Sequence, residues 1–201
     1  MKNSLCALLS MVFLFAGCEG IIEIGPPSKS PAPGKCPSDG CPDDKCPYSL
    51  VPPLDLPVEL REHNYAGGSC FHAGTISVLR HQNLHQVADY WRANFSGGAS
   101  VSTITRIAED IGLRYAYTNI GDPEFLEWCS RTRRGASITY YSRHAITFCG
   151  YVGGNAILMD NNRVEKEIKV PKSEFIRNWR GYGGQAFTVV YAPDPPRPWK
   201  G

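Results

Sequence analysis

Two short segments of the chain carry the residue types of a thiol nucleophile and its base. Cys70 follows the turn-forming pair Gly68-Ser69 and precedes an amphipathic stretch that starts at Phe71, so we expect it at the N-terminus of a helix. His144 stands at the start of an apolar, strand-like run. A free thiol has a pKa of about 8.5, and both a helix N-terminus and a nearby imidazolium lower that pKa. The sequence therefore predicts a pair that attacks an acyl carbon, provided that folding brings Cys70 and His144 together.

The other cysteines and histidines of this region have simpler interpretations. Cys129 and Cys149 lie in apolar surroundings, and we interpret them as core thiols or as a disulfide. His72 comes two residues after Cys70, so on a helix it faces away from the sulfur. His144 is therefore the histidine that we expect to serve as the base.

The composition is that of a globular protein with an added segment. The chain has 201 residues, 42% of them hydrophobic, and a formal net charge of +2. This length suggests one domain with or without a tail. Basic residues are scattered rather than gathered into a stripe, which argues against a nucleic-acid partner. We expect no cofactor.

The N-terminus carries the features of an export signal. Lys2 supplies a positive charge, residues 5–16 form an apolar run too short to span a bilayer comfortably, and two small residues directly precede Cys18. Residues 1–17 thus resemble a bacterial lipoprotein signal peptide, which implies that Cys18 is lipidated and begins the mature chain. An ordinary secretory signal or an uncleaved anchor is the alternative. In the lipoprotein family, Glu19 after the lipidated cysteine implies the outer membrane where the cell envelope has two membranes.

Residues 18–57 have the composition of a tether. Repeated prolines, with Gly, Ser, Asp and Lys between them, exclude regular helix or central strand and leave little apolar surface to bury. Cys36, Cys41 and Cys46 recur here every five residues, which is not the spacing of a zinc site, so we expect no metal. In an oxidising compartment these thiols are expected to form disulfides, within the tether or to another chain.

The remaining chain changes from helical to strand-like periodicity. Apolar residues at helical spacing predict one helix after Cys70, one over 84–94 and one that ends at Gly112. Asp122-Pro123 predicts the start of a fourth helix. Runs rich in β-branched and aromatic residues then predict strands over 136–141, 145–152, 156–161 and 186–192.

This order of elements predicts an α+β domain over residues 58–193, followed by a tail over 194–201. Helices first and strands afterwards, rather than in alternation, favour early helices packed on a C-terminal antiparallel sheet. In that arrangement the N-terminus of the Cys70 helix faces the edge where the His144 strand begins.

The motifs around the two candidate residues also match a known family. The Gly-Ser-Cys segment at Cys70, together with His144 and the later pair Gly150-Tyr151, resembles the active-site segments of papain-like cysteine peptidases. Over residues 64–191 the chain also resembles the small peptidase domains that cleave double-glycine leaders in bacteriocin exporters. The resemblance implies a papain-like fold and a cysteine peptidase that acts on a peptide or protein.

The resemblance also implies further site residues. Both groups place a third residue on the strand after the histidine, and sixteen residues beyond His144 stands Asp160. Another alignment selects Asn161, and because strand side chains alternate between faces, only one of the two is expected to point at His144. We favour Asp160, with Asn161 as the alternative. Both families place an oxyanion-binding glutamine six residues before the nucleophile, where this chain has Asn64 with its shorter stem.

Three functions remain open at this point. The first is a thiol hydrolase that acts as a peptidase, lipid-anchored in the cell envelope and facing outside the cytoplasm. The second is a catalytically inactive descendant that binds a peptide or protein partner. Acyl transfer to an amine is a third option, because the same residues can pass an acyl group to an amine instead of water.

Overall fold

The computed structural model describes residues 54–190. The predictions for the lipoprotein signal (1–17), lipidated Cys18, the tether cysteines Cys36, Cys41 and Cys46, and the tail over 194–201 all lie outside these residues. Within residues 54–190, no helix has both the length and the apolar character needed to cross a membrane.

The first half of the described chain forms helices, and apolar residues recur along them at helical spacing. Ser100 caps the last of the three α-helices, where its hydroxyl accepts a hydrogen bond from the Thr103 N–H. The first of these helices, α1 (Cys70–His81), is buried on every side from Phe71 to Leu79, so it is the central helix of the domain. After a short 3-10 turn, η1 (Val58–Leu60), the helices are α1 (Cys70–His81), α2 (His85–Asn94) and α3 (Val101–Asp110).

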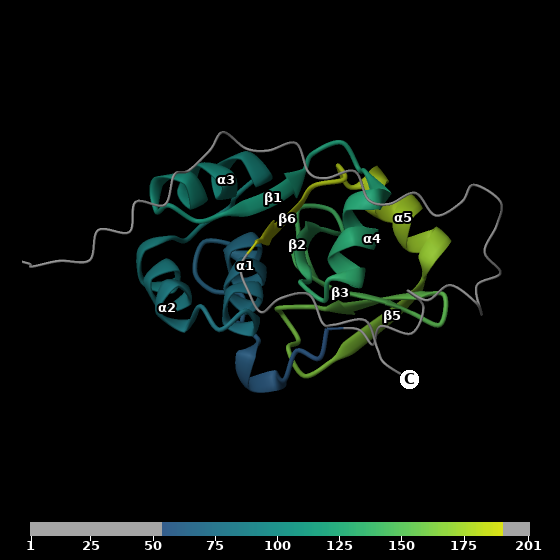
Figure 1. Ribbon diagram of the computed structural model, residues 1–201, viewed down its shortest axis with the longest axis horizontal. Coiled ribbons are helices and arrows are strands. Elements are labelled where there is room, and N and C mark those ends of the chain that lie inside the picture. Colours follow the sequence, from purple (N-terminus) through teal and green to yellow (C-terminus); the bar gives the residue numbers. More distant parts are fainter. Residues whose placement is uncertain (1–53, 191–201) are drawn as a thin grey trace, which may run out of the picture. The chain divides into compact units, whose positions relative to one another are not determined.

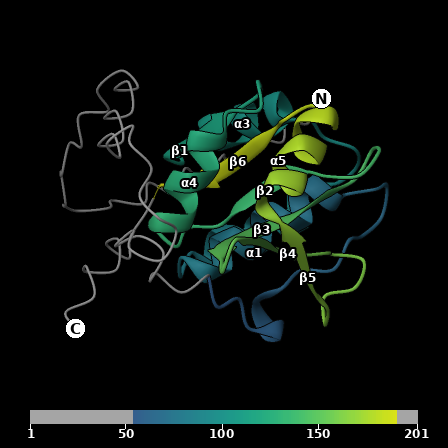
Figure 2. The same cartoon turned by 90° about the vertical axis from the view of Figure 1, so that its right-hand side faces the viewer.

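The second half supplies most of a six-stranded sheet, in which neighbouring strands pair antiparallel in the order β1-β6-β2-β3-β4-β5 (Figure 2). Two further helices, α4 (Pro123–Arg131) and α5 (Lys172–Gly181), connect strands. The strands are β1 (Tyr115–Thr118), β2 (Ala136–Thr139), β3 (Ala145–Val152), β4 (Asn155–Met159), β5 (Glu167–Pro171) and β6 (Ala186–Val189).

The sheet separates two apolar layers, because successive residues of a strand point to opposite faces. In β6, Phe187 and Val189 pack with α1, α2 and α3, whereas Ala186 packs with α4 and α5. Figure 1 shows α1 and α2 on one side of the sheet and α4 and α5 on the other. Trp179 of α5 is fully buried in the second layer.

The sequence did not predict β1, β5 and α5. β1 and β5 are the two edge strands, so each has one neighbour and exposes part of its length, which weakens the apolar pattern. α5 begins directly after Pro171 and buries Phe175 and Trp179, four residues apart. Its helical spacing was present in the sequence but covers little more than one turn.

The folded domain begins before the predicted boundary at residue 58. Leu54 and Leu56 are buried against Cys149, Ile157 and Met159, and the Leu54 N–H donates to the Cys149 carbonyl at 2.9 Å. Two leucines among prolines read as tether in the sequence, whereas the structure packs them against β3 and β4.

Candidate active site

A tight turn sets the start of α1 and thus the position of Cys70. Gly67 and Gly68 adopt φ values of 77° and 76°, a left-handed conformation that suits glycine. The Ser69 hydroxyl donates to the Ala66 carbonyl and accepts from the Gly97 N–H, both at 2.7 Å. Because these bonds anchor both sides of the turn, Cys70 is held as the first residue of the helix.

The same helix lies unusually close to the sheet. A Cβ atom at Gly74 would stand 2.5 Å from Oγ of Ser137 in β2, which is too near for any side chain at that position without movement. The Ser137 hydroxyl in turn donates to the Phe71 carbonyl at 3.1 Å. The close approach brings the first turn of α1 to the sheet.

His144 reaches Cys70 from the turn between β2 and β3. The Tyr140 N–H donates to the His144 carbonyl at 2.9 Å and closes this turn. The next residue, Ala145, donates its backbone N–H to the Cys70 sulfur at 3.3 Å. The His144 side chain acts directly on Cys70, because it lowers the pKa of the thiol while Cys70 raises the pKa of the imidazole.

Asp160 holds the far side of the His144 ring. Its Oδ1 lies 2.8 Å from Nε2 of His144. Because Asp160 occupies Nε2, Nδ1 is the ring nitrogen left for the Cys70 sulfur. The side-chain amide of Asn162 lies 3.3 Å from the same Nε2, and the Asn162 backbone N–H donates to Asp160 Oδ1 at 2.9 Å.

Asn161, the other candidate for this position, points to the opposite face. Its side-chain amide donates to the carbonyls of Cys70, at 2.8 Å, and Ala145, at 3.0 Å. It therefore ties the start of α1 to the start of β3. The structure places Asp160, rather than Asn161, at the imidazole.

A bulge in β3 decides which of the two residues meets His144. Beyond the bulge at Phe148 and Gly150, Tyr151 pairs with Ala156; before it, Thr147 pairs with Met159. Had the register of the Tyr151–Ala156 pair continued to the start of β3, Asn161 would share the face of His144. The extra residue in β3 shifts the pairing by one position and brings Asp160 there instead.

Asn64 lies beside the site and contacts it through Asn162. Its side-chain amide donates to Asn162 Oδ1 at 3.0 Å, and its backbone N–H donates to the Asn161 carbonyl at 2.8 Å. Asn162 was not among the predicted site residues; it lies in the turn that follows β4, where no strand periodicity indicates its direction. The role of Asn64 as an oxyanion donor stays a prediction.

The environment favours the charged forms of both reactive groups. Burial alone would raise the pKa of Cys70, but hydrogen bonds from His144 and Ala145 and the charge of His144 lower it overall. The hydrogen bond with Cys70 raises the pKa of His144, partly offset by burial and reinforced by Asp160. These opposite shifts favour a thiolate–imidazolium pair, the reactive form of a nucleophilic cysteine.

The other thiols and histidines do not join this arrangement. Cys129 and Cys149 are free, fully buried thiols in separate apolar clusters, so the prediction of core thiols is confirmed and a disulfide between them is not formed. His72 is buried and accepts a hydrogen bond from the Trp91 indole at 3.0 Å. Within residues 54–190, no three His, Cys, Asp or Glu side chains gather as metal ligands.

Comparison with solved structures identifies the fold. The chain matches a double-glycine-motif protease from an AMS/PCAT transporter, solved with its leader peptide, at a TM-score of 0.50 and 19% identity over 70% of this chain and 96% of that one. It matches a C39-like peptidase from Bacillus anthracis at 0.55 and 11%, over 70% and 98%. The peptidase domain of Streptococcus ComA, a bifunctional ABC transporter, matches at 0.50 and 17%, over 65% and 97%.

The domain has the papain-like fold of C39 peptidases. The predicted fold class, with a nucleophile helix packed on an antiparallel sheet, is thus confirmed. No family model matches the sequence. No curated protein matches it either.

Proposed function

We propose that this domain is a cysteine peptidase, with Cys70 as nucleophile, His144 as general base and acid, and Asp160 as the residue that orients His144. The observation that carries the proposal is the meeting of three groups: the His144 imidazole binds Asp160 at 2.8 Å, and the backbone N–H of the next residue, Ala145, donates to the Cys70 sulfur at 3.3 Å. The C39 fold supports peptide bonds as the substrate, since one structure with this fold was solved with a leader peptide.

In the proposed reaction, the Cys70 thiolate attacks the carbonyl carbon of a peptide bond and the carbonyl oxygen becomes an oxyanion. The backbone N–H groups of the first turn of α1 have no acceptor within the helix and stabilise that charge, with Asn64 as a second donor. His144 then protonates the leaving amine as the C–N bond breaks. A water molecule, deprotonated by His144, releases the acyl group from the sulfur.

We further propose that the peptidase acts outside the cytoplasm, tethered to a membrane by lipid on Cys18. The signal-like residues 1–17 and the proline-rich residues that follow support this. Mass spectrometry of the N-terminal fragment is expected to find diacylglycerol on Cys18, and Cys18→Ser is expected to move the protein from the detergent phase to the aqueous phase. An unmodified Cys18 in the wild-type chain contradicts the anchor.

The test of the peptidase is turnover combined with thiol labelling. The wild-type chain is expected to cleave peptides from a mixed library and to react selectively at Cys70 with iodoacetamide below the ordinary pKa of a thiol. Both activities are expected to be lost in Cys70→Ala and strongly reduced in His144→Ala. His85→Ala, which changes an exposed histidine of α2, is the matched control and should retain both. Slow labelling of several thiols without peptide cleavage contradicts the proposal.

One observation favours the second candidate, an inactive binder of peptides. The Asn64 side chain already donates to Asn162, and its stem is one methylene shorter than that of the glutamine expected there. Loss of one oxyanion donor costs about 100- to 1000-fold in kcat. Rapid labelling of Cys70 together with peptide binding and no turnover would favour this candidate.

A further inference from the structure

Two exposed tyrosines stand side by side, one of them in the turn that precedes His144. Tyr141, in the turn before His144, and Tyr182, after the end of α5, are each 41% exposed, and their ring centroids lie 6.3 Å apart. Both rings meet the buried Tyr140 edge to face, at 4.7 Å and 5.7 Å. Tyr140 in turn packs on the buried Phe175 of α5 at 5.6 Å. We call Tyr141 and Tyr182 the aromatic shelf.

Both rings of the shelf pack on a buried aromatic side chain, Tyr140. Aromatic rings in edge-to-face contact with a buried layer lose rotamer freedom before any ligand arrives, so less entropy is lost on binding. Large apolar side chains are usually withdrawn from water, and two exposed ones in mutual contact expose apolar area that a ligand can cover.

The backbone at Tyr141 gives a second, independent indication. Its φ is 62°, in the left-handed region where a side chain with a Cβ is disfavoured and glycine is the common choice. This conformation of Tyr141, three residues before His144, costs conformational energy, and strained backbone of this kind is often found at functional sites. The turn that imposes it is the one that the Tyr140 N–H and the His144 carbonyl close.

Tyr141 of the shelf lies in the short turn that leads into His144. Asp160 binds Nε2 of His144 at 2.8 Å, and the pKa of Tyr141 is raised by burial first and then by the charge of Asp160, so Tyr141 lies toward the Asp160 side of the imidazole. The acyl part of a substrate remains on the sulfur, whereas the leaving amine must reach the imidazole to accept its proton. The residues after the scissile bond therefore extend over His144 toward Tyr141 and Tyr182.

We propose that the aromatic shelf is a subsite for an aromatic or large aliphatic side chain among the first three residues after the scissile bond. This inference rests on the proposed peptidase function for its direction along the peptide. An apolar side chain on the shelf covers both exposed rings, and a ring there is held by the same contacts that hold Tyr141 on Tyr140. The subsite would make the enzyme select substrates by the sequence that follows the cut.

Binding is measured first, so that the test does not depend on turnover. The full chain carrying Cys70→Ala is titrated with four tripeptide amides, Ala-Ala-Ala and the three that carry one Phe at the first, second or third position. We expect one Phe peptide to bind about three- to tenfold more tightly than Ala-Ala-Ala, the size of one aromatic contact. Tyr141→Ala and Tyr182→Ala, each added to Cys70→Ala, should bring that ratio close to one.

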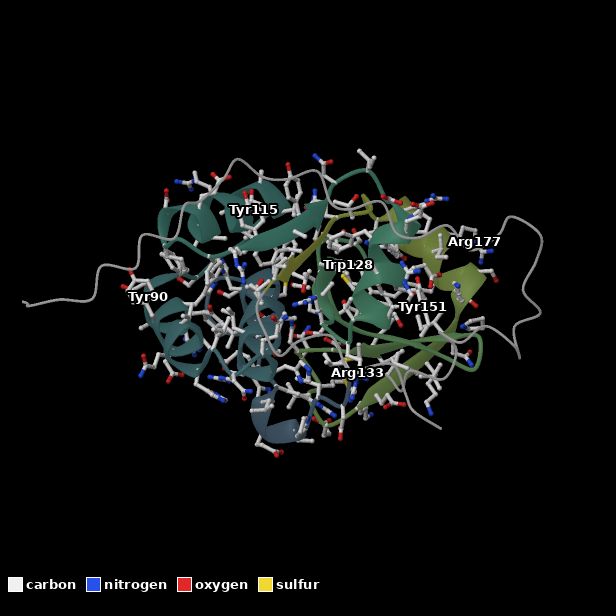
Figure 3. The ribbon with its side chains drawn as sticks, in the orientation of Figure 1. Tyr90, Tyr115, Trp128, Arg133, Tyr151 and Arg177 are labelled. Atoms are coloured by element: carbon white, nitrogen blue, oxygen red, sulfur yellow. The ribbon has the colours of Figure 1, made fainter. Side chains whose placement is uncertain are left out.

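Tyr90→Ala is the matched control. Tyr90 is 51% exposed on α2, at the other end of the molecule from α5 (Figure 3), and its loss should leave the ratio unchanged. Circular dichroism of each variant verifies the fold. The proposal is overturned when no Phe peptide binds more tightly than Ala-Ala-Ala, or when the preference survives the loss of both shelf tyrosines.

Turnover by the wild-type chain then separates the two proposals. Quenched fluorescent peptides with Phe or Ala at the same three positions are expected to differ in kcat/KM by a similar ratio, which the shelf variants reduce. Absence of cleavage with an intact Phe preference in binding defeats the peptidase and keeps the subsite. Cleavage without any preference defeats the subsite and keeps the peptidase.

Discussion

The sharpest test of the site compares two adjacent residues, Asp160 and Asn161, which the structure assigns to opposite tasks. Asp160→Ala removes a charge-assisted hydrogen bond to His144, of 2.8 Å, from the edge of the site. Asn161→Ala removes two hydrogen bonds that join the start of α1 to the start of β3. The first change should reduce chemistry and the second should reduce stability.

The magnitudes follow from the number and type of the bonds. A hydrogen bond to a charged group contributes about 1.5–3 kcal/mol, and each 1.36 kcal/mol is about tenfold in rate, so Asp160→Ala should lower kcat/KM about 10- to 150-fold. Two neutral hydrogen bonds contribute about 0.5–1.5 kcal/mol each, so Asn161→Ala should lower the free energy of unfolding by about 1–3 kcal/mol. Asp160→Asn retains an acceptor oxygen for Nε2 and should lose less activity than Asp160→Ala.

Urea unfolding and cleavage of a quenched fluorescent peptide are measured on the same preparations, with the rate of Cys70 alkylation as a second readout of the thiolate. We expect Asp160→Ala to unfold near the wild-type urea midpoint and Asn161→Ala to unfold earlier. The assignment of the two faces is wrong when Asn161→Ala loses turnover at unchanged stability while Asp160→Ala keeps full activity.

Four further predictions concern the nucleophile, the pH dependence of turnover, the helix that carries the nucleophile, and the oxyanion donor. The rate of Cys70 alkylation should rise at a pH below the ordinary pKa of a thiol. In His144→Ala the raising effect of burial on the Cys70 pKa is no longer opposed by His144, so the rise should move to higher pH. An unchanged pH profile would exclude a Cys70–His144 pair. Turnover should be bell-shaped, rising through the lowered pKa of Cys70 and falling through the raised pKa of His144. In Gly74→Ala the new methyl group would collide with Ser137, which should lower the free energy of unfolding by about 1–3 kcal/mol, while alanine regains about 1 kcal/mol through its higher helix propensity. Adding Ser137→Ala removes the collision and should restore part of the lost stability, as measured by urea unfolding. Asn64→Ala should reduce kcat more than it raises KM, by up to about 1000-fold, and equal effects on both would argue against an oxyanion role.

Most of the helices and the central strands were predictable because their signals are local. The start of α4, for example, was predicted from the capping pair Asp122-Pro123 alone. In the structure Asp122 accepts a hydrogen bond from the Glu124 N–H, as an N-cap residue does. The edge strands β1 and β5 lack such a signal, since half of their surface has no neighbour to specify it. The domain boundary was misplaced for a related reason, because Leu54 and Leu56 acquire their role from strands almost a hundred residues later.

Residue types and their spacing were enough to predict a cysteine at the start of a helix, a histidine at the start of a strand and an acid sixteen residues later. Those features depend on residue type and short-range periodicity, which a chain carries before it folds. The packed sheet was needed to show that Asp160 meets His144 and that Asn161 turns away, because one extra residue in β3 sets the register of its partner strand. The contacts of Asn162 and the pairing of Tyr141 with Tyr182 could not be predicted from the sequence either, since they join segments that are separated along the chain and become neighbours only in the folded domain.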